Sequence, residues 1–136
     1  MCKKINIDLL SPAEAVVAEE KVEIFKNKLS KGEELEPVVV VNLEGRFLVT
    51  DGNNRARAVA EYYKEHGSES VCQILTNERN SQSASDILKK EWMMISKYYG
   101  EGLEAFLKIR VSPETGYYQA QAEVIWEMRM QTQNIK

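Results

Sequence analysis

One segment of the sequence combines residue types and a spacing that could do chemistry, Asp51-Gly52-Asn53-Asn54-Arg55. It joins an apolar, strand-like run to an alanine-rich, helix-like run. The first backbone N–H groups of a helix lack internal partners, and the helix dipole favours negative charge there. Gly52 lets a ligand approach the backbone closely, and Arg55 supplies a two-pronged donor for phosphate oxygens. Asn53 and Asn54 add short polar groups that cap the helix or donate. The segment therefore predicts an anion site, and phosphate is the usual ligand of such sites.

The same residues also fit a plain strand–turn–helix junction. In that interpretation Asp51 and Gly52 only form a turn, an asparagine only caps the helix, and Arg55 is a solvated surface residue. Arg57 is a further candidate for binding phosphate. Because Arg55 and Arg57 are about 200° apart around a helix, they do not face the same phosphate. Arg57 therefore also fits a surface or salt-bridge role.

Five short pieces of the chain, spread over about residues 3–75, resemble the ParB/sulfiredoxin-like domain superfamily. They are Leu10-Ser11-Pro12, Lys31-Gly32, Pro37-Val38-Val39-Val40, the run from Val49 to Arg55 with its Gly-x-x-Arg box, and Ala58. The resemblance implies an α+β fold with a small mixed sheet in the order β-α-β-β-α-β. It also implies that the box binds nucleotide phosphates, so that the cofactor is CTP, ATP or ADP with Mg²⁺. Nucleotide hydrolysis or switching stays open, and the sequence does not decide whether the protein is an enzyme.

The branches of this superfamily differ in the box. The chromosome-partition branch binds CTP, and its pattern Gly-Glu-Arg-Arg-x-Arg-Ala is matched here at Gly52, Arg55, Arg57 and Ala58. Sulfiredoxin has a nucleophilic cysteine where this chain has Asn53, so sulfiredoxin chemistry is excluded.

A third branch, an ADP-dependent kinase for free serine, reads Asp-Gly-His-His-Arg and places an acidic base near the first loop. Here Asn53 and Asn54 replace both histidines, and asparagine does not transfer protons at neutral pH. Glu14 is the nearest match for the base, and Asp51 is the carboxylate of the box. These two are the candidate catalytic residues. Glu14 also fits the capping box of a helix that begins at Ser11.

Charge argues against a dedicated DNA-binding protein. The chain has 18 Lys and Arg against 21 Asp and Glu, a net charge of −3, and a pI near 5.3. Duplex-DNA binders usually carry a basic excess, because phosphate neutralisation dominates their affinity. A metal-dependent nuclease needs several converging carboxylates, and only Asp51 lies in the box, so no metal site is predicted. A DNA-associated accessory protein of a mobile element is kept as the first alternative, and the small-molecule kinase as the second.

The elements that must position the box are predicted from hydrophobic periodicity and turn signals. Ser11-Pro12 predicts a helix start, with a break near Ala18 and a stop at Gly32. The strands are expected over residues 3–10, 38–43, 46–50 and 71–75, with a helix over 54–66. Cys72, in the last of these strands, is expected to be a buried and inert thiol.

Residues after Thr76 change in character. A polar linker or exposed loop is expected over 77–83, followed by helices over 86–99, 102–110 and 117–131, with a hairpin at 113–116 as the competing interpretation. We therefore expect a ParB/sulfiredoxin-like domain over 1–76 and a helical extension over 77–136 that packs on it and supports a homodimer. No apolar run approaches the roughly 20 residues of a membrane helix. The N-terminus lacks a secretory signal, which predicts a bacterial-type cytoplasmic protein.

Overall fold

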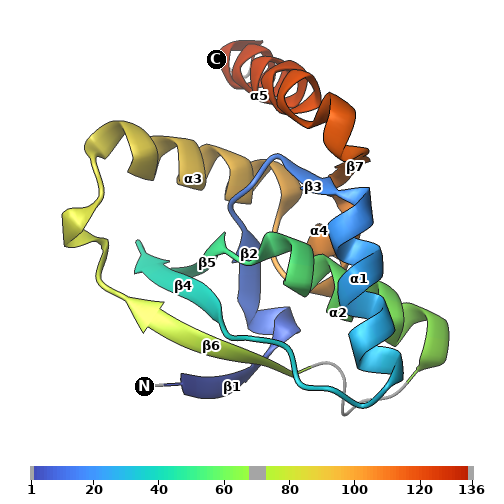
Figure 1. Cartoon of the computed structure of the whole chain (residues 1–136). Helices are drawn as coiled ribbons and strands as arrows, with labels where there is room; N and C mark the ends of the chain where they lie inside the picture. Colours follow the sequence, from blue (N-terminus) through green and yellow to red (C-terminus); the bar gives the residue numbers. More distant parts are fainter. Residues whose placement is uncertain (1, 68–72, 135–136) are drawn as a thin grey trace.

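Two sheets organise the chain in the computed structural model, which describes residues 2–67 and 73–134 (Figure 1). The larger sheet has five strands in the order β1-β6-β4-β5-β2. The β1–β6 and β4–β5 pairs are antiparallel, whereas the β4–β6 and β2–β5 pairs are parallel. The smaller sheet pairs β3 with β7 in parallel. The strands are β1 (Cys2–Asn6), β2 (Leu10–Pro12), β3 (Val16–Ala18), β4 (Val38–Leu43), β5 (Arg46–Asp51), β6 (Gln73–Arg79) and β7 (Arg110–Ser112).

Five α-helices within the described residues complete an α+β fold. They are α1 (Glu19–Ser30), α2 (Asn53–His66), α3 (Asp86–Tyr99), α4 (Leu103–Lys108) and α5 (Tyr117–Asn134). Short 3-10 turns lie at Ile7–Leu9, Ser81–Ser83 and Glu114–Gly116. In Figure 1, α1 and α2 lie together on one side of the strands. The helices α3 and α5 lie at the top of the view, where the C-terminus is marked.

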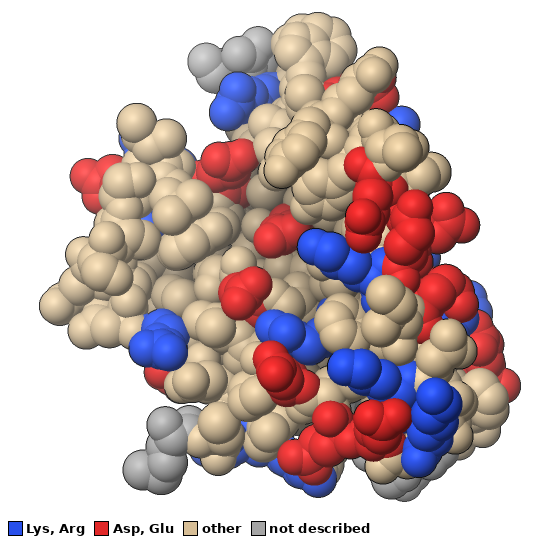
Figure 2. Space-filling view, viewed as in Figure 1, with Lys and Arg blue, Asp and Glu red and all other residues tan. Residues whose placement is uncertain are grey.

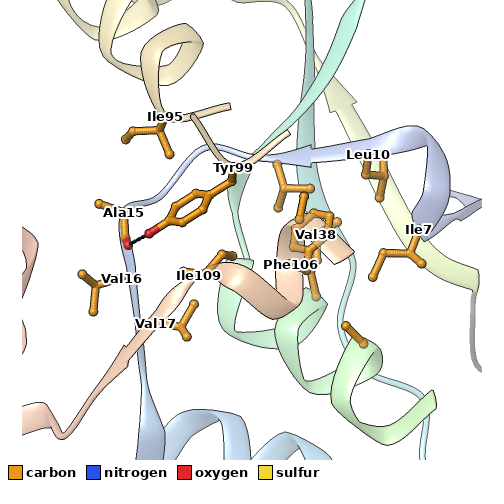
Figure 3. Packing of buried hydrophobic residues seen from close by; sticks show 14 of the residues in the cluster. Ile7, Leu10, Ala15, Val16, Val17, Val38, Ile95, Tyr99, Phe106 and Ile109 are labelled. Atoms are coloured by element: carbon orange, nitrogen blue, oxygen red, sulfur yellow. Dashed lines mark hydrogen bonds between the residues drawn. The ribbon is translucent and has the colours of Figure 1, made fainter. Parts of the chain in front are cut away.

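Residues from both halves of the chain share one hydrophobic core (Figure 3). Ile7 and Val38 from the sheet half pack in the same cluster as Phe106 and Ile109. The Tyr99 hydroxyl at the end of α3 donates to the Ala15 carbonyl at 2.5 Å. The elements after residue 76 therefore close the core of the sheet rather than standing apart from it.

Hydrogen bonds from Arg46 also hold the two halves of the chain together. Its guanidinium donates to the Ser96 hydroxyl at 3.2 Å, to the Ser96 carbonyl at 3.1 Å and to the Ser11 hydroxyl at 3.4 Å. Because Ser11 and Ser96 are both buried, these bonds fix α3 against β5 and β2.

The expected helix start at Ser11-Pro12 is wrong. Both residues belong to β2, which within the described residues is an edge strand paired only with β5. Proline suits such an edge because it has no N–H to leave unpaired. The capping-box role of Glu14 falls with it, because α1 begins at Glu19 after Ala18, as the expected break near Ala18 indicates. The expected strand over 3–10 is interrupted by the 3-10 turn at Ile7–Leu9.

The expected linker or exposed loop over 77–83 is also wrong in its first part, because β6 continues to Arg79. Polar residues run along this strand since one face is solvated, while Ile74 and Thr76 face the core. The three-residue strands β3 and β7 are not predicted, and the hairpin at 113–116 is a 3-10 turn. The helices over 54–66 and 86–99 are confirmed as α2 and α3. Cys72 and the start of the predicted strand over 71–75 lie outside the described residues.

Candidate functional site

The turn from β5 into α2 has the geometry that the sequence predicts. Gly52 is the N-cap residue of α2, with φ 98° and ψ 22° in the left-handed region. A Cβ at this position would lie 2.7 Å from the Val38 side chain and 2.6 Å from the Arg55 guanidinium. Only glycine fits this place without a local shift, so the turn brings backbone, helix start and arginine into close contact. No described side chain caps this end of α2, so its first N–H groups stay open.

The two asparagines of the turn are structural anchors. The side-chain amide of Asn53 donates to the Val49 carbonyl at 2.8 Å, and this residue is only 1% exposed. Its Oδ1 atom is buried and has no hydrogen-bond partner among the described residues. The Oδ1 atom of Asn54 accepts the Ala18 N–H at 2.8 Å. This bond ties the start of α1 to the start of α2, so neither asparagine is a freely swinging surface group.

Arg55 folds back over the turn, and its hydrogen-bonding capacity is poorly satisfied. Its side chain is 16% exposed, and its guanidinium carbon lies 5.9 Å from the centroid of the Phe25 ring. The buried Nε atom has no hydrogen-bond partner among the described residues. The ion pair of Arg55 with Glu36 is loose, with 4.0 Å between Nη1 and Oε2, and the Glu36 side chain is 89% exposed. A fixed cation with unused donors therefore stands beside the open helix start.

Arg57 is directed elsewhere. Its Nε atom donates to Glu61 at 2.6 Å, and its Nη1 atom donates to the carbonyls of Phe106 at 3.1 Å and Ile109 at 2.6 Å. These bonds hold α4 against α2. The structure does not bring Arg57 to the turn, in agreement with the angle between the two arginines on a helix.

Glu14 lies in the link between β2 and β3, within electrostatic range of Asp51 at the end of β5. Burial raises the pKa of the Glu14 carboxyl above its ordinary value, and the Asp51 charge adds to this rise. A hydrogen bond from Tyr117 and the charge of Lys21 oppose it. The two candidate catalytic carboxylates are thus neighbours beside the turn, one half-buried and one exposed.

Tyr117, at the start of α5, is the residue of this group that sequence reasoning missed. Its hydroxyl lies 3.1 Å from the Glu14 Oε2 atom and 3.2 Å from the Val16 carbonyl. Burial and the nearby Glu14 carboxylate raise the pKa of the Tyr117 hydroxyl, which stays protonated as a donor. No local pattern marks this contact, because the two residues are 103 positions apart.

A small cavity of about 260 Å³ reaches Arg55 from the side of the loop before β4. Buried and half-buried apolar residues, including Leu35, Val59 and Ile74, line its inner part. Lys4, Glu34 and Glu36 stand at its exposed side. Figure 2 shows acidic and basic side chains intermixed over α1 and the region where β5 passes into α2. The cavity has room for a group the size of a sugar or a base, with Arg55 at one wall.

The described residues contain neither a cluster of metal ligands nor a membrane-spanning helix. The described residues contain no cluster of three or more His, Cys, Asp and Glu that could hold a metal ion. Among the described helices, none has the length and apolar character needed to cross a membrane.

Comparison with known proteins gives information on the fold alone. No protein-family model matches the chain, and no curated protein matches it. Among solved structures, the chain is similar to protein Atu1540 from Agrobacterium tumefaciens, with a TM-score of 0.53 and 18% sequence identity. The match covers 83% of this chain and 63% of that one, so this chain spans less than two thirds of its neighbour's length. The likeness shows a shared α+β fold.

Proposed function

We propose that this chain is a ParB/sulfiredoxin-like domain with a C-terminal helical extension, and that it binds a nucleotide or another phosphate-bearing ligand at the β5–α2 turn. The observation that carries the proposal is Arg55, whose buried Nε atom has no partner among the described residues and whose guanidinium lies over Gly52. A buried donor without a partner costs about 1–3 kcal/mol, which a ligand oxygen would recover.

Phosphate fits this turn better than a single carboxylate does. The open N–H groups of α2 and the Arg55 fork together present several donors from different directions, and phosphate has three or four oxygens to accept them. Glu36 is the competing anion. Because it is exposed and its ion pair with Arg55 is loose, it can move aside when a ligand with more charge arrives.

A Mg²⁺ ion brought by the nucleotide would be held mainly by phosphate oxygens and water, as is usual for this ion. Asp51 is the carboxylate of the turn that would contribute to it.

Titration calorimetry with CTP, ATP and ADP, with and without Mg²⁺, tests this function. We expect at least one nucleotide to bind, and Arg55→Ala to weaken it by about 1.5–3 kcal/mol, the scale of a charged hydrogen bond. The matched control is Arg129→Ala, which removes an exposed arginine on α5 far along the chain. Equal affinity in the wild type and Arg55→Ala would remove the turn from consideration.

A second candidate is phosphoryl transfer to a small hydroxyl compound, of the kind carried out by the free-serine kinase branch. The proximity of Glu14 and Asp51 beside the turn favours it, because a carboxylate with a raised pKa is suited to accept a proton near neutral pH. Phosphorus NMR of the protein with ATP or ADP, Mg²⁺ and free serine is the measurement. Transfer that is lost in Glu14→Gln supports this candidate, and nucleotide binding without transfer rejects it.

The DNA-associated alternative gains no specific support. Arg46 and Arg57, which would have to join Arg55 in a basic rim, are both hydrogen-bonded within the fold.

A further inference from the structure

A second and larger hollow lies on a different part of the molecule, between α3 and α5. We call it the α3–α5 groove. Its volume is about 1130 Å³, and Figure 1 shows the two helices running in opposite directions along that side. Its lining residues come from the β4–β5 turn region, α3, α4 and α5. None of these residues belongs to the β5–α2 turn, so the groove is a separate feature.

The buried part of the lining is apolar and adaptable. Met93, Tyr99 and Met128 are buried, and Met94 is half-buried beside them. Methionine side chains are flexible and polarisable, and they are over-used at surfaces that accommodate apolar side chains of a partner. The floor therefore suits aliphatic or aromatic groups.

The exposed part of the lining is basic. Lys89, Lys90, Lys97 and Lys108 line the groove against two carboxylates, in a chain whose net charge is −3. Within the described chain, the side chains of these four lysines make no ion pair and no hydrogen bond. Lys26 on α1 shows the contrast, since it lies within 4 Å of three carboxylates. The positive charge of the groove is thus left without internal compensation.

The dimensions match a helix. The 14 residues of α3 make a wall about 21 Å long, and the step from Lys90 to Lys97 spans about two helical turns. A helix lying between α3 and α5 would bury an apolar stripe on the methionines and present carboxylates on its flanks at the same two-turn spacing. Drug-sized ligands usually occupy pockets of about 300–1,000 Å³, so this groove is larger than a small molecule needs.

We propose that the α3–α5 groove is a docking site for an acidic amphipathic helix of a partner protein. The apolar floor and the uncompensated lysines together select this occupant, because a nucleic acid would leave the methionines unmatched and a basic helix would be repelled.

The test uses a fluorescent helical peptide of about 18 residues, long enough to span α3, with leucine at positions i, i+3, i+4 and i+7 and glutamate on its flanks. Its matched control carries lysine in place of every glutamate. Fluorescence anisotropy with the full chain should show binding of the acidic peptide only, weakening as salt is raised. The double substitution Lys90→Glu and Lys97→Glu should weaken binding at least tenfold. Lys31→Glu with Lys64→Glu, which changes two exposed lysines elsewhere, should not.

Met94→Gln distinguishes docking from attraction between charges alone, because it leaves the lysines in place. It should also weaken the acidic peptide severalfold, and circular dichroism checks that each variant is folded. Three results would overturn the proposal: no binding of the acidic peptide at about 1 mM, the weakest affinity of interest, an equal loss with the control lysines, or no effect of Met94→Gln.

Discussion

At the scale of single residues, Glu14 is the group whose surroundings change its chemistry most clearly. Its carboxyl is partly withdrawn from water, and its neighbours act in opposite directions on its pKa. The Tyr117 hydroxyl stabilises the charged form, whereas the Asp51 carboxylate destabilises it. Glu14 thus lies between a hydroxyl donor and a second carboxylate. This arrangement resembles the acid–base pairs of active sites, in which different surroundings give two carboxyl groups different pKa values.

The prediction is that Glu14 titrates above its ordinary pKa of 4.5, and that two exposed or half-buried neighbours shift it in opposite senses. Tyr117→Phe removes a donor to the carboxylate and should raise the pKa of Glu14 further. Asp51→Asn removes a repelling charge and should lower it. Carbon-13 NMR titration of the Glu14 carboxyl reads both changes directly. A pKa below 4.5 in the wild type, or shifts of the same sign in both variants, would contradict this account.

The raised pKa also has a consequence for stability. The folded protein keeps the Glu14 proton to higher pH than the unfolded chain does, so folding is most favoured by this group below pH 4.5. That contribution is lost as pH rises through the folded pKa. Relative to Glu14→Gln, the unfolding free energy of the wild type should therefore fall across this range in urea titrations. A rise instead would mean that Glu14 is stabilised as an anion in the folded state.

At the scale of elements, the sequence predicts best where local signals and tertiary context agree. The strand–glycine–helix junction at the box is of this kind, because Gly52 and the alanine stripe of α2 suit both the local turn and the packing. The place of Arg55 in the first turn of α2 could therefore be predicted, whereas its fold over Gly52 and the anchoring of both asparagines could not.

The errors arise where distant pairing decides the local structure. Ser11-Pro12 has a strong helix-start pattern, yet pairing with β5 makes it a strand. The polar end of β6 has a linker composition, yet it pairs with β4 on one side. The Glu14–Tyr117 contact joins the two ends of the chain and has no local signal. Hydrophobic periodicity reports only on one segment and its near neighbours in sequence. It therefore cannot predict strand pairing or side-chain contacts between distant parts of the chain.

Arg57 provides a prediction at this scale, because it joins α2 to α4. Arg57→Met keeps an apolar stem but removes the donors to the carbonyls of Phe106 and Ile109. The free energy of unfolding should fall by about 2–3 kcal/mol, as expected when charged hydrogen bonds to buried groups are lost. Urea unfolding measures this change, with the exposed Arg129→Met as control. Nucleotide affinity at the β5–α2 turn should stay within about twofold, which is under 0.5 kcal/mol. A stable variant with weakened nucleotide binding would instead return Arg57 to the site.

At the scale of the whole molecule, the last helix leaves an apolar face in water. Tyr118, Trp126 and Met130 on α5 are 85%, 63% and 37% exposed. With Ala122 they are spaced four residues apart, which places them along one side of the helix. The opposite side, with Val124 and Met128, is buried in the core. Contiguous apolar surface of this kind usually marks an interface.

This face is complementary to itself. If two copies of α5 pack antiparallel about a two-fold axis near residue 124, Trp126 of one copy lies opposite Ala122 of the other, and Tyr118 lies opposite Met130. A large side chain then meets a small one, and an aromatic ring meets a sulfur, which are both favourable contacts. Two-fold dimers are also the commonest closed assembly of soluble proteins. We therefore propose a homodimer through α5, and none of its four face residues lines the α3–α5 groove.

Sedimentation velocity tests this assembly. At about 100 μM protein, a dimer with a Kd near 1 μM would be almost fully formed. Trp126→Glu should convert it to a monomer, because each copy would have to bury a charged carboxylate against Ala122 of the other, whereas the exposed Glu127→Gln one position along should leave the dimer intact. Since Trp126 lies opposite the buried side of α5, the substitution should not lower the unfolding free energy measured at monomer concentrations. Binding of the acidic peptide to the groove should be unchanged in Trp126→Glu, which separates the two surfaces. A wild-type monomer at this concentration would reject the homodimer.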